Sequence, residues 1–76
     1  MSILSDEDLA YLREANHICN GATNVYFDRL QVAQAMGKDR ILSGTENRLI
    51  EHGCIELRDT GHARLTEKGV EKATSK

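Results

Sequence analysis

Side chains able to contact a nucleic acid gather in two short segments of the second half of the chain. The first segment carries Lys38, Arg40, Ser43, Asn47 and Arg48, and the second carries Arg58, His62 and Arg64. Arginine offers donors that suit guanine, and asparagine offers an amide that suits adenine, so the first segment has groups that read base edges. Lys38 and the second segment would meet phosphate or the minor groove. The chemistry expected of these residues is recognition of a DNA duplex.

The charge of the chain limits this expectation, because phosphate neutralisation supplies most nonspecific affinity for nucleic acids. Ten basic and twelve acidic residues give a net charge of −2, which argues against indiscriminate binding. The distribution is uneven. Residues 1–37 hold two basic and five acidic groups, a balance of −3, whereas residues 38–76 hold eight and seven, a balance of +1. An anion would therefore dock on the carboxyl-terminal half.

Alternation of apolar and polar residues predicts a β-hairpin that would carry the second segment. Ile55 and Leu57 fall on one face of the first strand, and Ala63 and Leu65 do the same on the second, so each strand should be half buried. The connection Asp59-Thr60-Gly61 offers a carboxylate that can bond its own backbone and a glycine that tolerates positive φ.

A helix from about Asp39 to His52 would carry the first segment. Leu42 and Leu49 form its inward stripe, with Thr45 and Glu46 beside them. The opposite, polar face holds Arg40, Gly44, Asn47 and Glu51, with Ser43 and Arg48 at its edges. A carboxylate at Glu46 is unusual for an inward position, and Gly44 lowers helix stability by about 1 kcal/mol relative to alanine. A start near Ser43 or Thr45 is the alternative, and it would move Arg40 into the preceding loop.

Three further helices and one short strand complete the expected fold. Ser5, Asp28 and Thr66 are placed to cap helices, with Gln31 completing a capping box after Asp28. Glycines should end helices at Asn20-Gly21, Gly37 and Gly53. A brief strand is expected within Thr23–Phe27. The first helix should bury Leu9, Leu12, Ala15 and Cys19. The second should bury Leu30, Ala33 and Met36, or else Val32 and Met36. The last should bury Val70 and Ala73.

The order and spacing of these elements resemble a known family. Leu49, Gly53, Ile55, a polar turn and then Leu65-Thr66-Glu67-Lys68-Gly69 resemble the end of a winged helix-turn-helix domain. The pattern is similar to the DNA-binding core of the multiple-antibiotic-resistance-type and phenolic-acid-type repressors, and it covers roughly Asp28 to Ala73.

The resemblance implies an α+β fold with a three-helix core, a small antiparallel hairpin wing over residues 54–66 and a carboxyl-terminal helix. Residues 1–76 would form a single such domain. It also implies a DNA-binding transcriptional regulator that inserts its third helix into the major groove of double-stranded DNA. Such regulators commonly form a homodimer that reads two half-sites, for which the first or last helix would be the pairing element; binding as a monomer with low affinity is the alternative.

A protein-binding winged helix is the main alternative. Glu46 and Glu51 near the groove face, and Glu56 and Asp59 on the wing, would repel phosphate. The helix and hairpin would then contact another protein, and a fold alone cannot choose between these partners.

Catalytic, metal and membrane functions are not expected. The sequence has no glycine-rich phosphate loop and no motif that pairs a nucleophile with a histidine, so neither an enzyme nor a cofactor site is predicted. His17, Cys19, His52 and Cys54 are ligand types, but His-x-Cys repeated twice is not a recognised zinc pattern, and the cysteines should be reduced and partly buried. The apolar runs are short and no signal peptide is evident, so we expect a cytoplasmic protein that does not enter a membrane.

Overall fold

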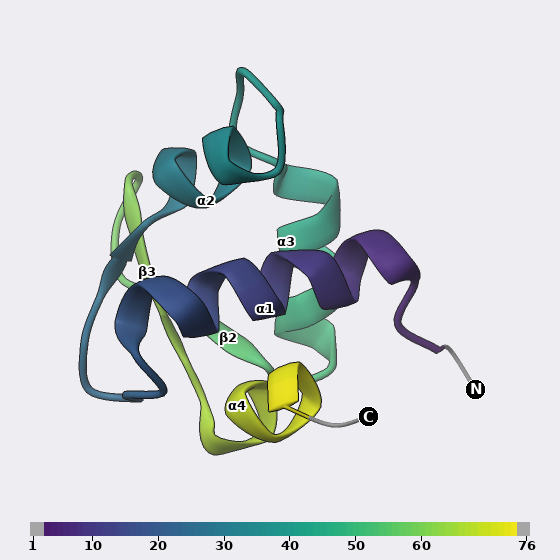
Figure 1. Ribbon diagram of the computed structural model, residues 1–76, viewed down its shortest axis with the longest axis vertical. Coiled ribbons are helices and arrows are strands. Elements are labelled where there is room, and N and C mark those ends of the chain that lie inside the picture. The colour runs from purple at the N-terminus through teal and green to yellow at the C-terminus, as the bar shows by residue number, and fades with distance from the viewer. Residues whose placement is uncertain (1–2, 75–76) are drawn as a thin grey trace.

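The computed structural model describes residues 3–74, which form four helices and a three-stranded antiparallel sheet. In chain order the elements are α1 (Asp6–Cys19), β1 (Phe27–Asp28), α2 (Arg29–Ala35), α3 (Ser43–Glu51), β2 (Ile55–Leu57), β3 (His62–Leu65) and α4 (Glu67–Thr74) (Figure 1). The α+β class expected from the sequence is confirmed. The sequence also predicts fraying of Thr74-Ser75-Lys76, but Thr74 is the last residue of α4, and Ser75 and Lys76 lie outside the described residues.

Local capping chemistry fixes both ends of α1. The Ser5 hydroxyl accepts a hydrogen bond from the Asp8 amide at 3.2 Å, and the Asp8 carboxylate accepts from the Ser5 amide at 3.0 Å. This reciprocal pair is a capping box. Asn20 takes the left-handed conformation with φ of 54° and ends the helix at the expected place.

The helix α2 begins and ends where the sequence indicated, whereas α3 begins later than the first expectation. The Asp28 carboxylate accepts from the amides of Leu30 and Gln31 at 2.9 and 3.3 Å, which is the Asp28 half of the predicted capping box. The expected start of α3 at Asp39 is wrong, and Ser43, the alternative, is correct. The turn that closes α2 continues to Lys38, whose amide donates to the Ala33 carbonyl at 2.9 Å, so the chain needs further residues to change direction.

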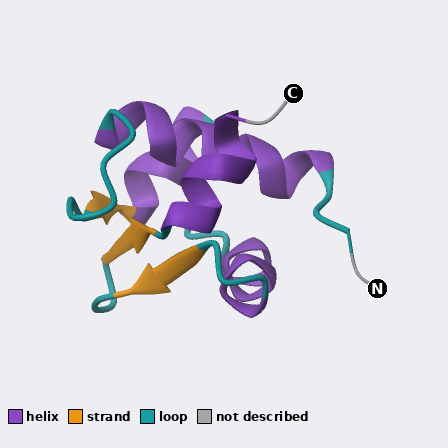
Figure 2. Ribbon diagram, turned by 90° about the horizontal axis from the view of Figure 1, so that it is seen from below, coloured by secondary structure: helices purple, strands orange, loops and turns teal. Residues whose placement is uncertain are grey.

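The sheet has the order β1-β3-β2, so the central strand β3 pairs with both of the others. Phe27 and Leu57 both lie opposite Ala63, and Ile55 lies opposite Leu65. The first strand is shorter than expected and includes only the last residue of the predicted Thr23–Phe27 segment. Figure 2 shows the strands together at one edge of the molecule, with helices covering one side of the sheet.

Two expectations about the hairpin are corrected. Leu57 was expected on the buried face of its strand beside Ile55, but its side chain is 43% exposed because it ends an edge strand. Gly61 is not among the glycines with positive φ. The turn depends instead on the Asp59 carboxylate, which accepts from the amides of Gly61 and His62 at 2.9 and 2.8 Å.

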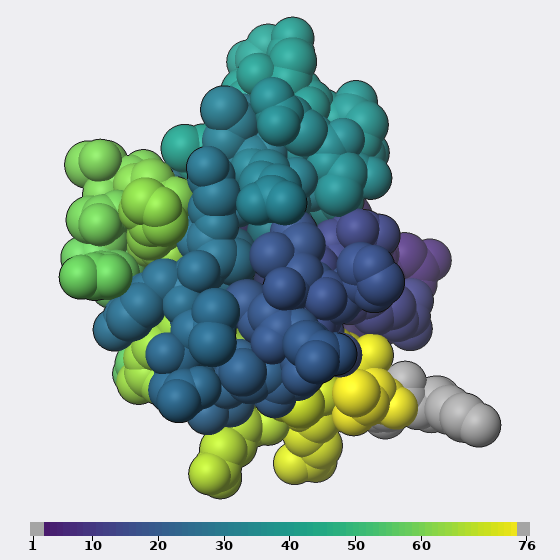
Figure 3. Space-filling model, turned by 60° about the vertical axis from the view of Figure 1, so that its left-hand side comes forward, coloured from purple at the N-terminus to yellow at the C-terminus, as the bar shows by residue number. Residues whose placement is uncertain are grey.

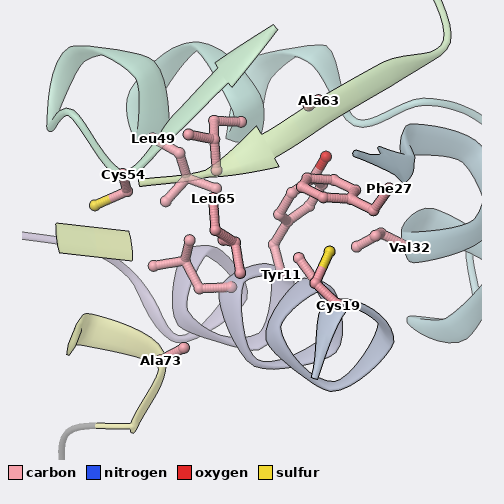
Figure 4. Packing of buried hydrophobic residues seen from close by; sticks show 12 residues of the cluster. Tyr11, Cys19, Phe27, Val32, Leu49, Cys54, Ala63, Leu65 and Ala73 are labelled. Carbon is pink, nitrogen blue, oxygen red and sulfur yellow. The ribbon is translucent and has the colours of Figure 1, made fainter. Parts of the chain in front are cut away.

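The core joins all these elements around α1. Tyr11 and Phe27 meet edge to face, with ring centroids 6.2 Å apart. Figure 4 shows their rings beside aliphatic side chains from α2, α3 and the sheet. The buried hydrophobic cluster comprises Tyr11, Leu12, Ala15, Cys19, Phe27, Val32, Leu49, Cys54, Ile55, Ala63, Leu65 and Ala73. In α2, Val32 and Ala33 face inward as predicted and Met36 is partly buried, but the expectation for Leu30 is wrong because its side chain is exposed.

The last helix packs unusually close to the start of β2. Thr66 caps it as predicted, since its hydroxyl accepts from the Gly69 amide at 3.1 Å. A Cβ atom on Gly69 would lie 2.0 Å from the Cys54 carbonyl oxygen. This approach is possible only for glycine. Within the described residues, no helix is long and apolar enough to cross a membrane.

Candidate nucleic-acid interface

The outward face of α3 is open to solvent and polar apart from Ile50, which is 38% exposed. Ser43, Gly44, Asn47 and Glu51 are exposed on it, as the sequence predicted. A Cβ atom on Gly44 would meet nothing within 4 Å, so the surface at this position is flat. Serine and asparagine side chains at the start and middle of an exposed helix can donate to and accept from base edges.

The segment between α2 and α3 brings positive charge to the amino-terminal end of this face. Lys38 and Arg40 are both exposed there, and Arg40 lies in the loop rather than in the helix. Asp39 lies 3.7 Å from the Arg40 guanidinium, but this pair is fully on the surface and stabilises little. Figure 3 shows the teal segment as a projection at one end of the molecule. No side chain caps the amino-terminal end of α3. The positive end of the helix dipole lies at this end, next to Lys38 and Arg40.

Arg48 is already bound within the protein. Its Nε atom lies 3.1 Å from both carboxylate oxygens of Asp8, and its Nη2 atom lies 2.9 Å from one of them. The Asp8 side chain is buried while that of Arg48 is half exposed. Burial acts to raise the pKa of the Asp8 carboxyl, but hydrogen bonds from Arg48 and Ser5 outweigh it and hold that pKa below its ordinary value. Arg48 therefore joins α3 to α1.

Glu46 also turns inward, which corrects the expectation that it would repel phosphate at the groove face. Its side chain is 1% exposed, and the Arg29 guanidinium contacts both of its oxygens at 2.6 to 3.1 Å. The Tyr11 hydroxyl donates to the same carboxylate at 2.5 Å. Burial first, and then Glu46, raise the pKa of Tyr11, so the phenol stays protonated. Among the two glutamates of concern on α3, only Glu51 remains exposed.

Two hairpin side chains that could meet an anion, Arg64 and His62, already contact carboxylates of the hairpin. Arg64 pairs with Glu56 and donates to the Thr23 carbonyl, and the His62 ring lies 3.1 Å from the Asp59 carboxylate. Hydrogen bonds from the Gly61 amide and from His62 hold the pKa of Asp59 below its ordinary value.

Arg58 differs from Arg64 and His62. Its guanidinium lies over the Tyr26 ring, 4.6 Å from the centroid, and none of the ion pairs found within residues 3–74 includes it. A cation on an aromatic face keeps its full charge. Arg58 is therefore the hairpin residue best able to meet an anion.

The sequence did not reveal the roles of Arg29 and Tyr11. A carboxylate at the inward position of Glu46 was the available signal, because a buried charge requires a partner. The identity of that partner was not visible, since Arg29 lies 17 residues and Tyr11 lies 35 residues from Glu46. Only the folded chain brings the three side chains together.

The metal alternative gains no support from the geometry. Among residues 3–74, no group of three or more histidine, cysteine, aspartate or glutamate side chains could hold a metal ion. Cys19 and Cys54 are free and buried. Burial raises the pKa of both thiols, which keeps them protonated.

Comparison with known proteins adds no relative. No protein-family model, no curated protein and no solved structure matches the chain.

Proposed function

We propose that the chain is a winged-helix domain that binds double-stranded DNA and regulates transcription. The order of elements, with α2 and α3 joined by a turn and followed by the β2–β3 hairpin, is compatible with the winged helix-turn-helix domains that the sequence resembles and supports this proposal. The observation that carries the proposal is the face of α3. With Glu46 in the core, this face is polar apart from the exposed Ile50, flat at Gly44 and flanked by Lys38 and Arg40.

In this proposal α3 enters the major groove and the hairpin lies against the DNA backbone. Ser43 and Asn47 would contact base edges, while Lys38, Arg40 and Arg58 would contact phosphates. Arg48 uses Nε and Nη2 to hold Asp8, which leaves Nη1 for a single phosphate contact rather than a bidentate base contact. His62 and Arg64 would contribute less, because both already contact carboxylates of the hairpin. A homodimer that reads two half-sites remains part of the proposal.

An NMR titration with mixed-sequence duplex DNA at low salt tests the proposal. Amide shifts should change at residues 38–48 and 58–64 and remain unchanged along α4. Replacing Asn47 with alanine should weaken binding to a preferred duplex by about 1–3 kcal/mol and alter the preference among sequences. Lys72→Ala is the control because it removes an exposed cation of α4, a helix that is not part of the proposed interface. A spectrum that does not respond to DNA would remove the proposal.

A protein partner is the second candidate, and one observation favours it. Val25, Tyr26 and Leu57 are large hydrophobic side chains that stay exposed, and Arg58 lies over the Tyr26 ring. Aromatic residues and arginine are enriched at protein interfaces. If this surface binds protein, amide shifts should change at residues 25, 26 and 57 when the concentration of the chain is raised or a partner protein is added. DNA should then cause no change.

A further inference from the structure

Arg29 contacts two parts of the molecule that are distant from it in sequence, α3 and the hairpin turn. Its Nε and Nη2 atoms hold the Glu46 carboxylate of α3 at 2.6 to 3.1 Å. Its Nη1 atom donates to the carbonyls of Thr60 at 2.8 Å and Asp59 at 3.4 Å, and its backbone amide donates to the Gly61 carbonyl at 2.9 Å. One residue at the start of α2 therefore binds both the Glu46 side chain of α3 and three consecutive carbonyls of the hairpin turn.

The side of this contact that meets Glu46 is buried, whereas the side that meets the turn is exposed. The Arg29 side chain is 11% exposed, and the carboxylate that it holds is also bound by the Tyr11 hydroxyl from α1. The guanidinium is planar, with donors on two edges: one edge meets Glu46 and the other faces the turn. A shift of the turn relative to α3 would break one of these sets of bonds.

We propose that Arg29 is a positioning residue that fixes the hairpin turn relative to α3. Arg58 directly precedes the turn carbonyls that Arg29 holds, so Arg29 sets the distance between Arg58 and Asn47. The consequence for binding rests on the proposed function, because these residues would meet the DNA backbone and a base edge of one duplex. Arg29 itself need not touch DNA.

Replacing Arg29 with lysine tests whether the planar guanidinium, rather than its positive charge alone, holds the turn. Arg29→Lys keeps a cation beside the buried Glu46, but one ammonium group cannot span both the carboxylate and the turn. A triple variant, Tyr11→Phe with Arg29→Met and Glu46→Leu, replaces the whole polar chain by apolar groups and guards against an unpaired buried charge. Thr45→Val is the matched control. It removes the hydrogen bonds of the Thr45 hydroxyl with Glu7 of α1 and with Arg48, and neither bond involves the turn.

Backbone ¹⁵N relaxation is the direct test, and it does not depend on DNA. In Arg29→Lys and in the triple variant, the order parameters of residues 59–61 should fall from about 0.85 to below about 0.6. Residue 54, whose amide donates to the Leu49 carbonyl at 2.8 Å, should keep its order parameter. Thr45→Val should leave both regions unchanged. Equal order at residues 59–61 in all four proteins would overturn the inference.

Affinity for the same mixed-sequence duplex provides the functional test. At equal folded fraction, Arg29→Lys should bind about tenfold more weakly with a smaller salt slope, whereas Thr45→Val should bind like the original chain. A mobile turn with unchanged affinity would overturn the positioning role. If the original chain binds no duplex, the proposed function fails, and the relaxation measurement alone then decides whether Arg29 positions the turn.

Discussion

The close packing of α4 against β2 predicts that Gly69→Ala destabilises the protein, although alanine favours helices. A Cβ atom at this position would lie 2.0 Å from the Cys54 oxygen and 3.0 Å from its carbonyl carbon. The shortest distance from a Cβ atom in ordinary contact is 3.4 Å, so the Cys54 oxygen, at 2.0 Å, would have to move by about 1.4 Å. The carbonyl cannot yield freely, because it also accepts from the Thr66 amide at 3.0 Å.

The magnitude follows from two opposing effects. Replacing a helical glycine with alanine stabilises a helix by about 1 kcal/mol. Overpacking usually costs about 1–3 kcal/mol, and a clash with backbone lies at the upper end of that range. We expect a net loss of about 2 kcal/mol, which at about 4–8 °C per kcal/mol is a large fall in Tm for a domain of this size.

Urea denaturation followed by circular dichroism measures the effect, and Gly44→Ala is the matched control. Gly44 also lies in a helix, but its added Cβ would meet nothing within 4 Å. Gly44→Ala should therefore raise the urea midpoint while Gly69→Ala lowers it. Equal stabilisation by both substitutions would show that α4 does not approach β2 as closely as described.

Three other substitutions test separate contacts. Arg48→Ala leaves the buried Asp8 carboxylate without its main partner, so it should lower the urea midpoint at pH 7. The pKa of Asp8 is lower in the folded protein than in the unfolded chain, so its ion pair stabilises the fold above a pH of about 4 and this stabilisation is lost as the pH falls further. The difference in urea midpoint between the variant and the original chain should therefore close in acid. A gap independent of pH would contradict this pairing. Asp28→Ala removes the cap of α2 and should cost about 1 kcal/mol by the same denaturation assay, whereas no loss would mean that the cap is not needed. Arg58→Ala should weaken binding to every duplex and reduce the salt slope by about one, and an unchanged slope in a fluorescence anisotropy titration would exclude a phosphate contact.

Features that depend on neighbouring residues were predictable from the sequence. Ser5, Asp28 and Thr66 cap helices because their side chains reach amides two or three residues away. Gly37 and Gly53 have positive φ where helices end, as expected of a residue without a Cβ atom. The alternating pattern also located both strands of the hairpin.

Features that depend on distant partners were not predictable. Arg48 has the same local pattern as an outward base-reading residue, and only its approach to Asp8, 40 residues away, shows that it joins two helices. Glu46 was placed beside the inward stripe, but its neutralisation by Arg29 was invisible. The late start of α3 depends on how the chain closes α2. For the candidate interface, the sequence indicated the correct elements but not which side chains remain available.

The buried pair of Arg29 and Glu46 also constrains how this chain can change over evolutionary time. Losing either partner alone leaves an uncompensated charge in the interior, which typically costs about 3–5 kcal/mol, whereas replacing both by apolar residues is often neutral. A domain of this size has only about 5–15 kcal/mol of stability. Descendants of this chain should therefore keep both residues or exchange both, so that positions 29 and 46 covary even though 17 residues separate them.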